Sequence, residues 1–90
     1  MKKSDFVAMV ADKSGLSKKD AEVAVNAYNE AIIEALKMGE KVQLVGFGTF
    51  EPRHRAARDG FNPLTKEKIR IKASISPSFK AGKAFKDALN

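Results

Sequence analysis

The sequence predicts an α+β fold in which helices form a body and antiparallel strands extend into a ribbon. Apolar residues recur at helical spacing as far as Met38, whereas from Lys41 onward they alternate at every second position. The charges divide at the same place, because residues 1–45 hold seven Lys or Arg and seven Asp or Glu, while residues 46–90 hold ten and four. The whole net charge of +6 therefore lies in the half that is predicted to form strands.

This uneven charge predicts a polyanionic partner, with nucleic acid as the first candidate and an acidic membrane surface as the second. The chain has no Cys and its only His is His54, which excludes disulfides, thiolate zinc sites and clusters of His ligands. No Gly-rich phosphate loop and no carboxylate pair beside a nucleophile is present, so we predict a protein that is not an enzyme and needs no cofactor or metal. The start MKKSDFVAMVA is interrupted by Asp5 and Asp12, and no apolar run approaches the ~20 residues of a membrane span. We expect a soluble, cytoplasmic protein with no membrane and no small-molecule substrate.

The first helix is predicted to begin at Ser4, a candidate N-cap residue. Its apolar face holds Phe6, Met9 and Val10, which follow helical spacing. The helix is expected to end at Gly15, because glycine readily adopts the left-handed conformation that closes many helices.

A second helix is predicted from the capping-box-like segment SKKD at 17–20 to about Met38, with Gly39 as its terminator. Its apolar arc is wider than one small core requires, since it holds Ala21, Ala24, Val25, Ala27, Tyr28, Ala31, Ile32, Ala35 and Leu36. The helix is either enclosed within a monomer or covered by a second subunit. Because a 90-residue chain without disulfides buries little surface by itself, we favour a dimer.

Three strands are predicted after the helices. The first contains Val42 and Leu44, and the segment GFGTF at 46–50 forms a turn into a second strand that extends as far as Asp59. The third strand covers about residues 68–74. Alternation separates its two faces, one with Ile69, Ile71 and Ala73 and the other with Lys68, Arg70 and Lys72.

A short helix is predicted to begin at Pro77 and Ser78 and to complete the chain. Its apolar side holds Ala81, Ala84, Phe85, Ala88 and Leu89, and a separate basic stripe holds Lys80, Lys83 and Lys86.

The second and third strands are expected to pair as a projecting two-stranded arm. Between Arg53 and Asp59 only alanine could enter a core, so this part of the hairpin cannot be packed into a globule. The clustered basic side chains repel one another unless phosphates lie between them. They are Arg53, Arg55, Arg58, Lys66, Lys68, Arg70 and Lys72. The alternative is a strand pair that uses Lys and Arg only to stay soluble.

The connecting segment GFNPLTKEK at 60–68 places Phe61, Pro63 and Leu64 where a soluble protein usually has polar residues. A two-stranded ribbon can lie in a groove of B-DNA, and proteins that bind the minor groove often insert apolar wedges between base steps. The rigid proline ring suits this role because its burial costs little side-chain entropy. Alternatively, Asn62 and Pro63 simply form a turn.

Over its whole length the chain resembles the HU/IHF family of bacterial histone-like DNA-bending proteins. The resemblance is carried by KVQLVGFGTFEPRHRAARDG at 41–60, by NP at 62–63 and by PSFKAGKAFKDALN at 77–90. It implies an intertwined homodimer whose helical body comprises 1–51 and 73–90 and whose β-ribbon arms, 52–72, embrace DNA through the minor groove.

The resemblance also assigns roles to individual residues. It implies that Pro63 intercalates and bends the duplex. The implied DNA-binding residues are Lys3, Arg53, Arg55, Arg58, Phe61, Asn62, Pro63, Lys66, Lys68, Arg70, Lys72, Lys80, Lys83 and Lys86. The implied dimer core consists of Tyr28, Ile32, Leu36, Leu44, Phe47, Phe50 and Phe79.

Two positions depart from the family pattern. Most members carry Arg directly before the NP pair, where this chain has Phe61, and many carry Gly at the position of Lys66. Phe61 is a candidate second wedge beside Pro63, and the alternative is that it covers the partner strand of its own arm.

The leading functional hypothesis is an architectural, largely sequence-nonspecific protein that binds, bends and compacts double-stranded DNA on the nucleoid, with a preference for bent or distorted duplexes. The alternative is a sequence-specific, IHF-like bending factor that works with a second subunit. RNA is a third possibility, although the grooves of A-form RNA suit such an arm poorly.

Overall fold

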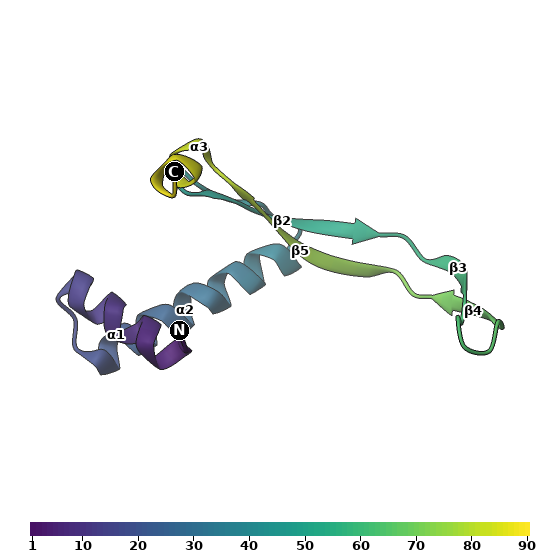
Figure 1. Cartoon of the computed structure of the whole chain (residues 1–90), viewed down its shortest axis with the longest axis horizontal. Coiled ribbons are helices and arrows are strands. Elements are labelled where there is room, and N and C mark those ends of the chain that lie inside the picture. Colours follow the sequence, from purple (N-terminus) through teal and green to yellow (C-terminus); the bar gives the residue numbers. More distant parts are fainter. The chain divides into compact units, whose positions relative to one another are not determined.

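The computed structural model describes residues 1–90 and contains three helices and five strands (Figure 1). In chain order these are α1 (Lys3–Ser14), α2 (Lys18–Lys37), β1 (Val42–Leu44), β2 (Gly48–Arg55), β3 (Arg58–Phe61), β4 (Lys68–Ile71), β5 (Ser74–Ala81) and α3 (Lys83–Ala88). Helices followed by antiparallel strands confirm the predicted α+β class. The chain forms two compact units, Met1–Glu34 and Ala35–Asn90, and each is described by itself.

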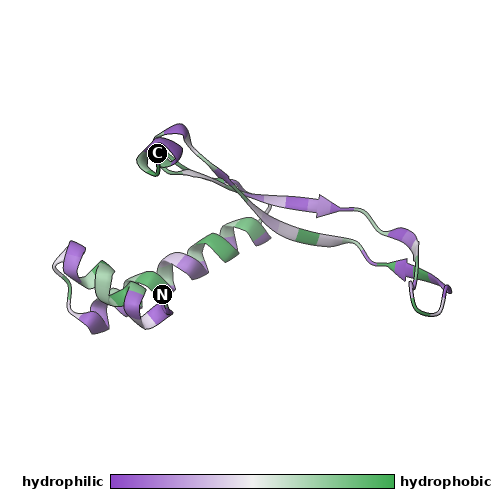
Figure 2. Ribbon diagram, viewed as in Figure 1, coloured by the Kyte–Doolittle hydropathy of each residue, from purple (hydrophilic) through white to green (hydrophobic).

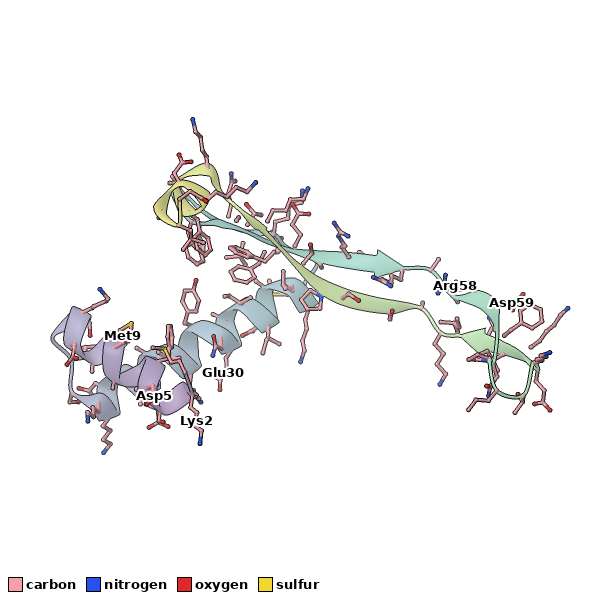
Figure 3. The ribbon with its side chains drawn as sticks, in the orientation of Figure 1. Lys2, Asp5, Met9, Glu30, Arg58 and Asp59 are labelled. Carbon is pink, nitrogen blue, oxygen red and sulfur yellow. The ribbon has the colours of Figure 1, made fainter.

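Local hydrogen bonds explain where the first two helices begin and end. The backbone N–H of Lys2 donates to the Asp5 carboxylate at 3.0 Å, so α1 is capped two residues earlier than predicted and Ser4 lies inside it (Figure 3). Gly15 ends α1 with a φ of 76°, as expected. The Ser17 hydroxyl accepts the Asp20 N–H at 3.1 Å and thereby caps α2.

The core of the first unit is small. It consists of Val7, Ala11 and Ala21, with Val10 and Val25 packed against it. Phe6 and Met9, which were predicted on the apolar face of the first helix, are both exposed in the single chain. Small alanines bring α1 and α2 together, so the buried stripe is centred on Val7 and Ala11 and the larger side chains lie beside it.

The second unit contains a three-stranded antiparallel sheet in the order β1-β2-β5. The turn predicted from GFGTF joins β1 to β2, with the Phe47 N–H donating to the Leu44 carbonyl at 3.0 Å and Gly46 at a φ of 83°. Strands β2 and β5, called the base ribbon below, form eight cross-strand pairs from Gly48–Ala81 to Arg55–Ser74. The base ribbon thus belongs to the three-stranded sheet and extends beyond β1 as a two-stranded ladder.

The C-terminal prediction was wrong, because residues 74–81 form a strand and the last helix begins only at Lys83. Pro77 lies directly opposite Pro52, so two residues that both lack an N–H occupy the same cross-strand pair and the ladder loses few hydrogen bonds. Lys80 consequently lies on β5 opposite Thr49, not on a helical stripe with Lys83 and Lys86.

Strands β3 and β4 form four further cross-strand pairs, from Arg58–Ile71 to Phe61–Lys68, and are called the tip ribbon (Figure 1). The second strand was predicted to reach Asp59 without a break, but the ladder stops after Arg55 and resumes at Arg58. The third strand likewise divides into β4 and β5. Two unpaired residues lie on each side, 56–57 and 72–73, so the register continues across this joint without a bulge.

Candidate nucleic-acid interface

The base ribbon has two chemically different faces, because directly opposite residues of an antiparallel pair share a face. One face, called the Arg/Ser face, contains the cross-strand pairs Arg53–Ser76, Arg55–Ser74, Glu51–Ser78 and Thr49–Lys80. The other is largely apolar and contains Phe50–Phe79, Pro52–Pro77 and His54–Ile75. Figure 2 shows the outer part of β2 as hydrophilic and β5 as less so, with a hydrophobic band. The sheet therefore turns its arginines away from its aromatic residues.

Most of the guanidinium groups on the base ribbon and the tip ribbon have no acidic partner. The chain contains two ion pairs, Lys41–Glu51 at 3.8 Å and Arg70–Asp59 at 3.1 Å. Arg53, Arg55 and Arg58 are exposed and form neither an ion pair nor a side-chain hydrogen bond within the chain. Their charge is thus available to a polyanion. Arg70, by contrast, already donates to Asp59 across the tip ribbon.

The tip ribbon also has two faces, as its alternation predicted. Phe61–Lys68 and Asp59–Arg70 lie on one, whereas Arg58–Ile71 and Gly60–Ile69 lie on the other. Arg58 and Asp59 are labelled in Figure 3. The side chain of Phe61 is two-thirds exposed, at 67%. An aromatic ring therefore stands beside the cations of this face with little cover from its own strand partner.

The turn at the end of the tip ribbon is organised by Asn62. Its side-chain oxygen accepts the Leu64 N–H at 2.9 Å, its carbonyl accepts the Lys66 N–H at 2.7 Å, and its N–H donates to the Glu67 carbonyl at 2.9 Å. These bonds hold the exposed Pro63 and Leu64 at the apex. Asn62 and Pro63 do form a turn, and that turn presents the proline to solvent.

Lys66 has a φ of 59°, in the left-handed region that glycine adopts without strain. It is the only non-glycine residue of the chain with positive φ. The turn therefore keeps a lysine at a conformational cost of about 1 kcal/mol.

The remaining predicted contact residues lie outside the two ribbons. Lys3, on α1, lines a hollow of the first unit together with Lys18 and Lys19 of α2. Sequence reasoning missed these two lysines, because only the packing of α1 against α2 brings them to Lys3. Lys80 is exposed on β5, and Lys83 and Lys86 are exposed on α3.

The residues predicted for a dimer core are incompletely covered within each of the two units. The rings of Phe50 and Phe79 stack with centroids 4.7 Å apart, and those of Phe47 and Phe85 stack at 4.6 Å. Phe79 nevertheless remains 39% exposed. Of the predicted set Leu36 is buried, Ile32, Leu44 and Phe50 are half-buried, and Tyr28 and Phe47 are exposed. None of the helices combines the length and apolar character of a membrane span.

Comparisons with known proteins agree with this arrangement of residues. The family model described as bacterial DNA-binding protein matches residues 1–90. The DNA-binding protein HU of Lactococcus lactis is 62% identical over 87 residues, covering 97% of this chain and 96% of the relative. The DNA-binding protein HU of Clostridium pasteurianum is 60% identical over 90 residues, covering 100% and 99%.

Solved structures show the same likeness. An HU–DNA cocrystal structure from Anabaena matches with a TM-score of 0.88 at 48% identity, over 99% of this chain and 97% of that one. HU from Thermotoga maritima matches with a TM-score of 0.69 at 36% identity, over the full length of both chains. The match of the family model to every residue, supported by these full-length relatives, shows that the chain belongs to the HU/IHF family of bacterial DNA-binding proteins.

Proposed function

We propose that this protein is an architectural DNA-binding protein that binds double-stranded DNA with little sequence preference and bends it. The observation that carries the proposal is the set of unpaired arginines, Arg53, Arg55 and Arg58. They lie on the hairpin formed by the base ribbon and the tip ribbon, which ends in the exposed Pro63. The names of the relatives support it, since they are DNA-binding HU proteins and one solved relative is an HU–DNA cocrystal. The family supports a non-enzymatic role, on the nucleoid in the cytoplasm.

The hairpin formed by the two ribbons would act on DNA in two ways. Unpaired guanidinium groups neutralise phosphates and release counterions, which supplies affinity that does not depend on sequence. The apex would enter the minor groove and insert Pro63 between base steps, so that the duplex kinks away from it. In this division of roles, residues 52–72 form the arm, and residues 1–51 and 73–90 form the body that holds two arms in place.

A homodimer would complete the body. The single chain buries only four hydrophobic side chains, Val7, Ala11, Ala21 and Leu36. Tyr28 remains 48% exposed, and the aromatic cluster around Phe79 is open to solvent. A second copy of the chain would cover these surfaces and so supply the core that a chain of this length lacks.

A salt titration tests the proposal. Fluorescence anisotropy of a labelled duplex should show log K falling linearly against log salt, with similar slopes for unrelated sequences. A flat response would contradict it. Competition between one candidate site and bulk DNA tests the alternative, because a sequence-specific factor would retain its site against a large excess of unrelated duplex.

A further inference from the structure

Three serines line one edge of the Arg/Ser face of the base ribbon. Ser74, Ser76 and Ser78 alternate along β5 with the apolar residues of the opposite face. Their hydroxyls make no hydrogen bond within the chain, whereas the hydroxyls of Ser14 and Ser17 bond the backbone at helix ends. Serine is not among the residues that strands favour, so strand propensity does not explain this row.

The residues opposite the serines differ in charge. Ser74 lies directly opposite Arg55 and Ser76 directly opposite Arg53, whereas Ser78 lies opposite Glu51. The Cβ atoms of such opposite residues are ~5 Å apart, so each hydroxyl stands beside the stem of its partner's side chain. Two pairs thus join a free guanidinium to a free hydroxyl, and the third joins a carboxylate to a hydroxyl.

A phosphate group fits the first two pairs and not the third. Its oxygens accept several hydrogen bonds at once, from a planar guanidinium and from a neutral O–H donor together. Serine hydroxyls are ordinary phosphate contacts in protein–DNA complexes. Glu51 would repel a phosphate, and its carboxylate already faces Lys41 at 3.8 Å.

We propose that Ser74 and Ser76 are phosphate-contact residues, and that the pairs Arg55–Ser74 and Arg53–Ser76 each bind one DNA phosphate with both side chains. The inference rests on the proposed function, since it specifies how the base ribbon holds the backbone of the duplex. It also predicts a gap in the phosphate contacts at Glu51–Ser78, the next pair along the same face.

Three alanine variants of the full-length dimer test this assignment on one labelled duplex. Ser74→Ala and Ser76→Ala should each weaken binding about tenfold, the value of one hydrogen bond to a charged group. The slope of log K against log salt should not change, because a hydroxyl carries no charge. Ser78→Ala is the matched control, with the same side chain on the same face of the same strand, and should bind like the wild type.

Two further comparisons assign the effect to the pairs. Ser76→Ala should cost less affinity in the background of Arg53→Ala than in the wild type, while its cost in the background of Arg55→Ala should be unchanged. Ser76→Thr, which keeps the hydroxyl, should restore binding. Thermal unfolding of each variant measures any loss of stability separately.

The outcomes distinguish the inference from the proposed function. If the wild type binds duplexes without salt dependence, the proposed function itself fails. If the wild type binds with a steep salt slope but all three alanine variants bind as it does, only the assignment of Ser74 and Ser76 is wrong. Equal weakening by all three variants would also overturn it, since the cause would then be the strand and not the opposite arginine.

Discussion

The base ribbon and the tip ribbon have the same topology and a continuous register, yet their side chains suit different tasks. The base ribbon pairs over eight residues, is bonded to β1 and keeps Arg53 and Arg55 free of acidic partners. The tip ribbon pairs over four, has no third strand and engages Arg70 with Asp59. Exposed apolar side chains lie at its end, Phe61 on β3 and Leu64 in the turn beyond it. The difference teaches that cations extend along the whole hairpin, whereas the most exposed apolar side chains, Phe61 and Leu64, lie only at its far end.

The joint between the two ribbons makes this difference physically reasonable. Residues 56–57 and 72–73 are unpaired, and three of the four are alanines with little to pack. A two-stranded ribbon of four pairs is marginally stable in water. We therefore expect the tip ribbon to adjust its angle when the apex meets a duplex, and the base ribbon to stay fixed in its sheet.

The largest expected effect comes from replacing a glycine in each ribbon by alanine, which compares how tightly the two ribbons are packed. A Cβ at Gly48 would lie 2.5 Å from both the Phe79 ring and the Lys80 carbonyl. The backbone cannot move aside cheaply, so Gly48→Ala should lower the free energy of unfolding by about 3 kcal/mol in urea denaturation.

Gly60→Ala is the matched variant in the tip ribbon. Its Cβ would lie 2.9 Å from Cδ1 of Ile71, the mobile end of a side chain, so the loss should stay below about 1 kcal/mol. Equal losses for the two variants would mean that both ribbons are packed alike.

A second prediction contrasts their arginines. Arg55→Ala should weaken binding to all duplexes alike and lower the salt slope by about one, since it removes an unpaired charge. Arg70→Ala should change the slope less, because Asp59 already offsets that charge at 3.1 Å. Anisotropy titrations at several salt concentrations measure both. Asp59→Asn is the control. In a chain that is otherwise wild type, it should tighten DNA binding because it frees Arg70. A slope for Arg70→Ala as low as that for Arg55→Ala would show that the ion pair does not persist on DNA.

A third prediction separates affinity from bending. Pro63→Ala should reduce the bend of a duplex while weakening binding only a few-fold, because most affinity comes from phosphate contacts. Energy transfer between dyes at the two duplex ends measures the bend. Leu64→Ala, one residue further along the same exposed apex, controls for general loss of apolar surface. Unchanged bending in Pro63→Ala would discard the proline wedge.

Sequence reasoning correctly predicted the structural features that depend on local chemistry. Gly15 and Gly39 end their helices with positive φ, and GFGTF forms the predicted turn. It failed where a distant partner decides the structure. Pro77 and Ser78 are a reasonable helix start when considered alone, and only the pairing with β2, where Pro52 lies opposite Pro77, makes a strand favourable there.

The interface was predictable to a similar extent. The unpaired arginines and the exposed Pro63 follow from a stretch that has too few apolar residues to be buried. The Asp59–Arg70 ion pair and the row of serines follow from the register, which residue types alone do not determine. Lys18 and Lys19 join Lys3 only because α1 packs against α2.

The smallest expected effect concerns the apex itself. Lys66→Gly should remove the strain of a φ of 59° and stabilise the turn by about 1 kcal/mol. Because the tip ribbon opens locally, the gain should appear as slower hydrogen exchange of the Leu64 N–H, which donates to Asn62, and not in global unfolding. Lys66→Ala removes the same charge but keeps the strain, so it should leave that exchange rate unchanged. Equal protection in both variants would show that the lysine side chain, and not its backbone conformation, destabilises the turn.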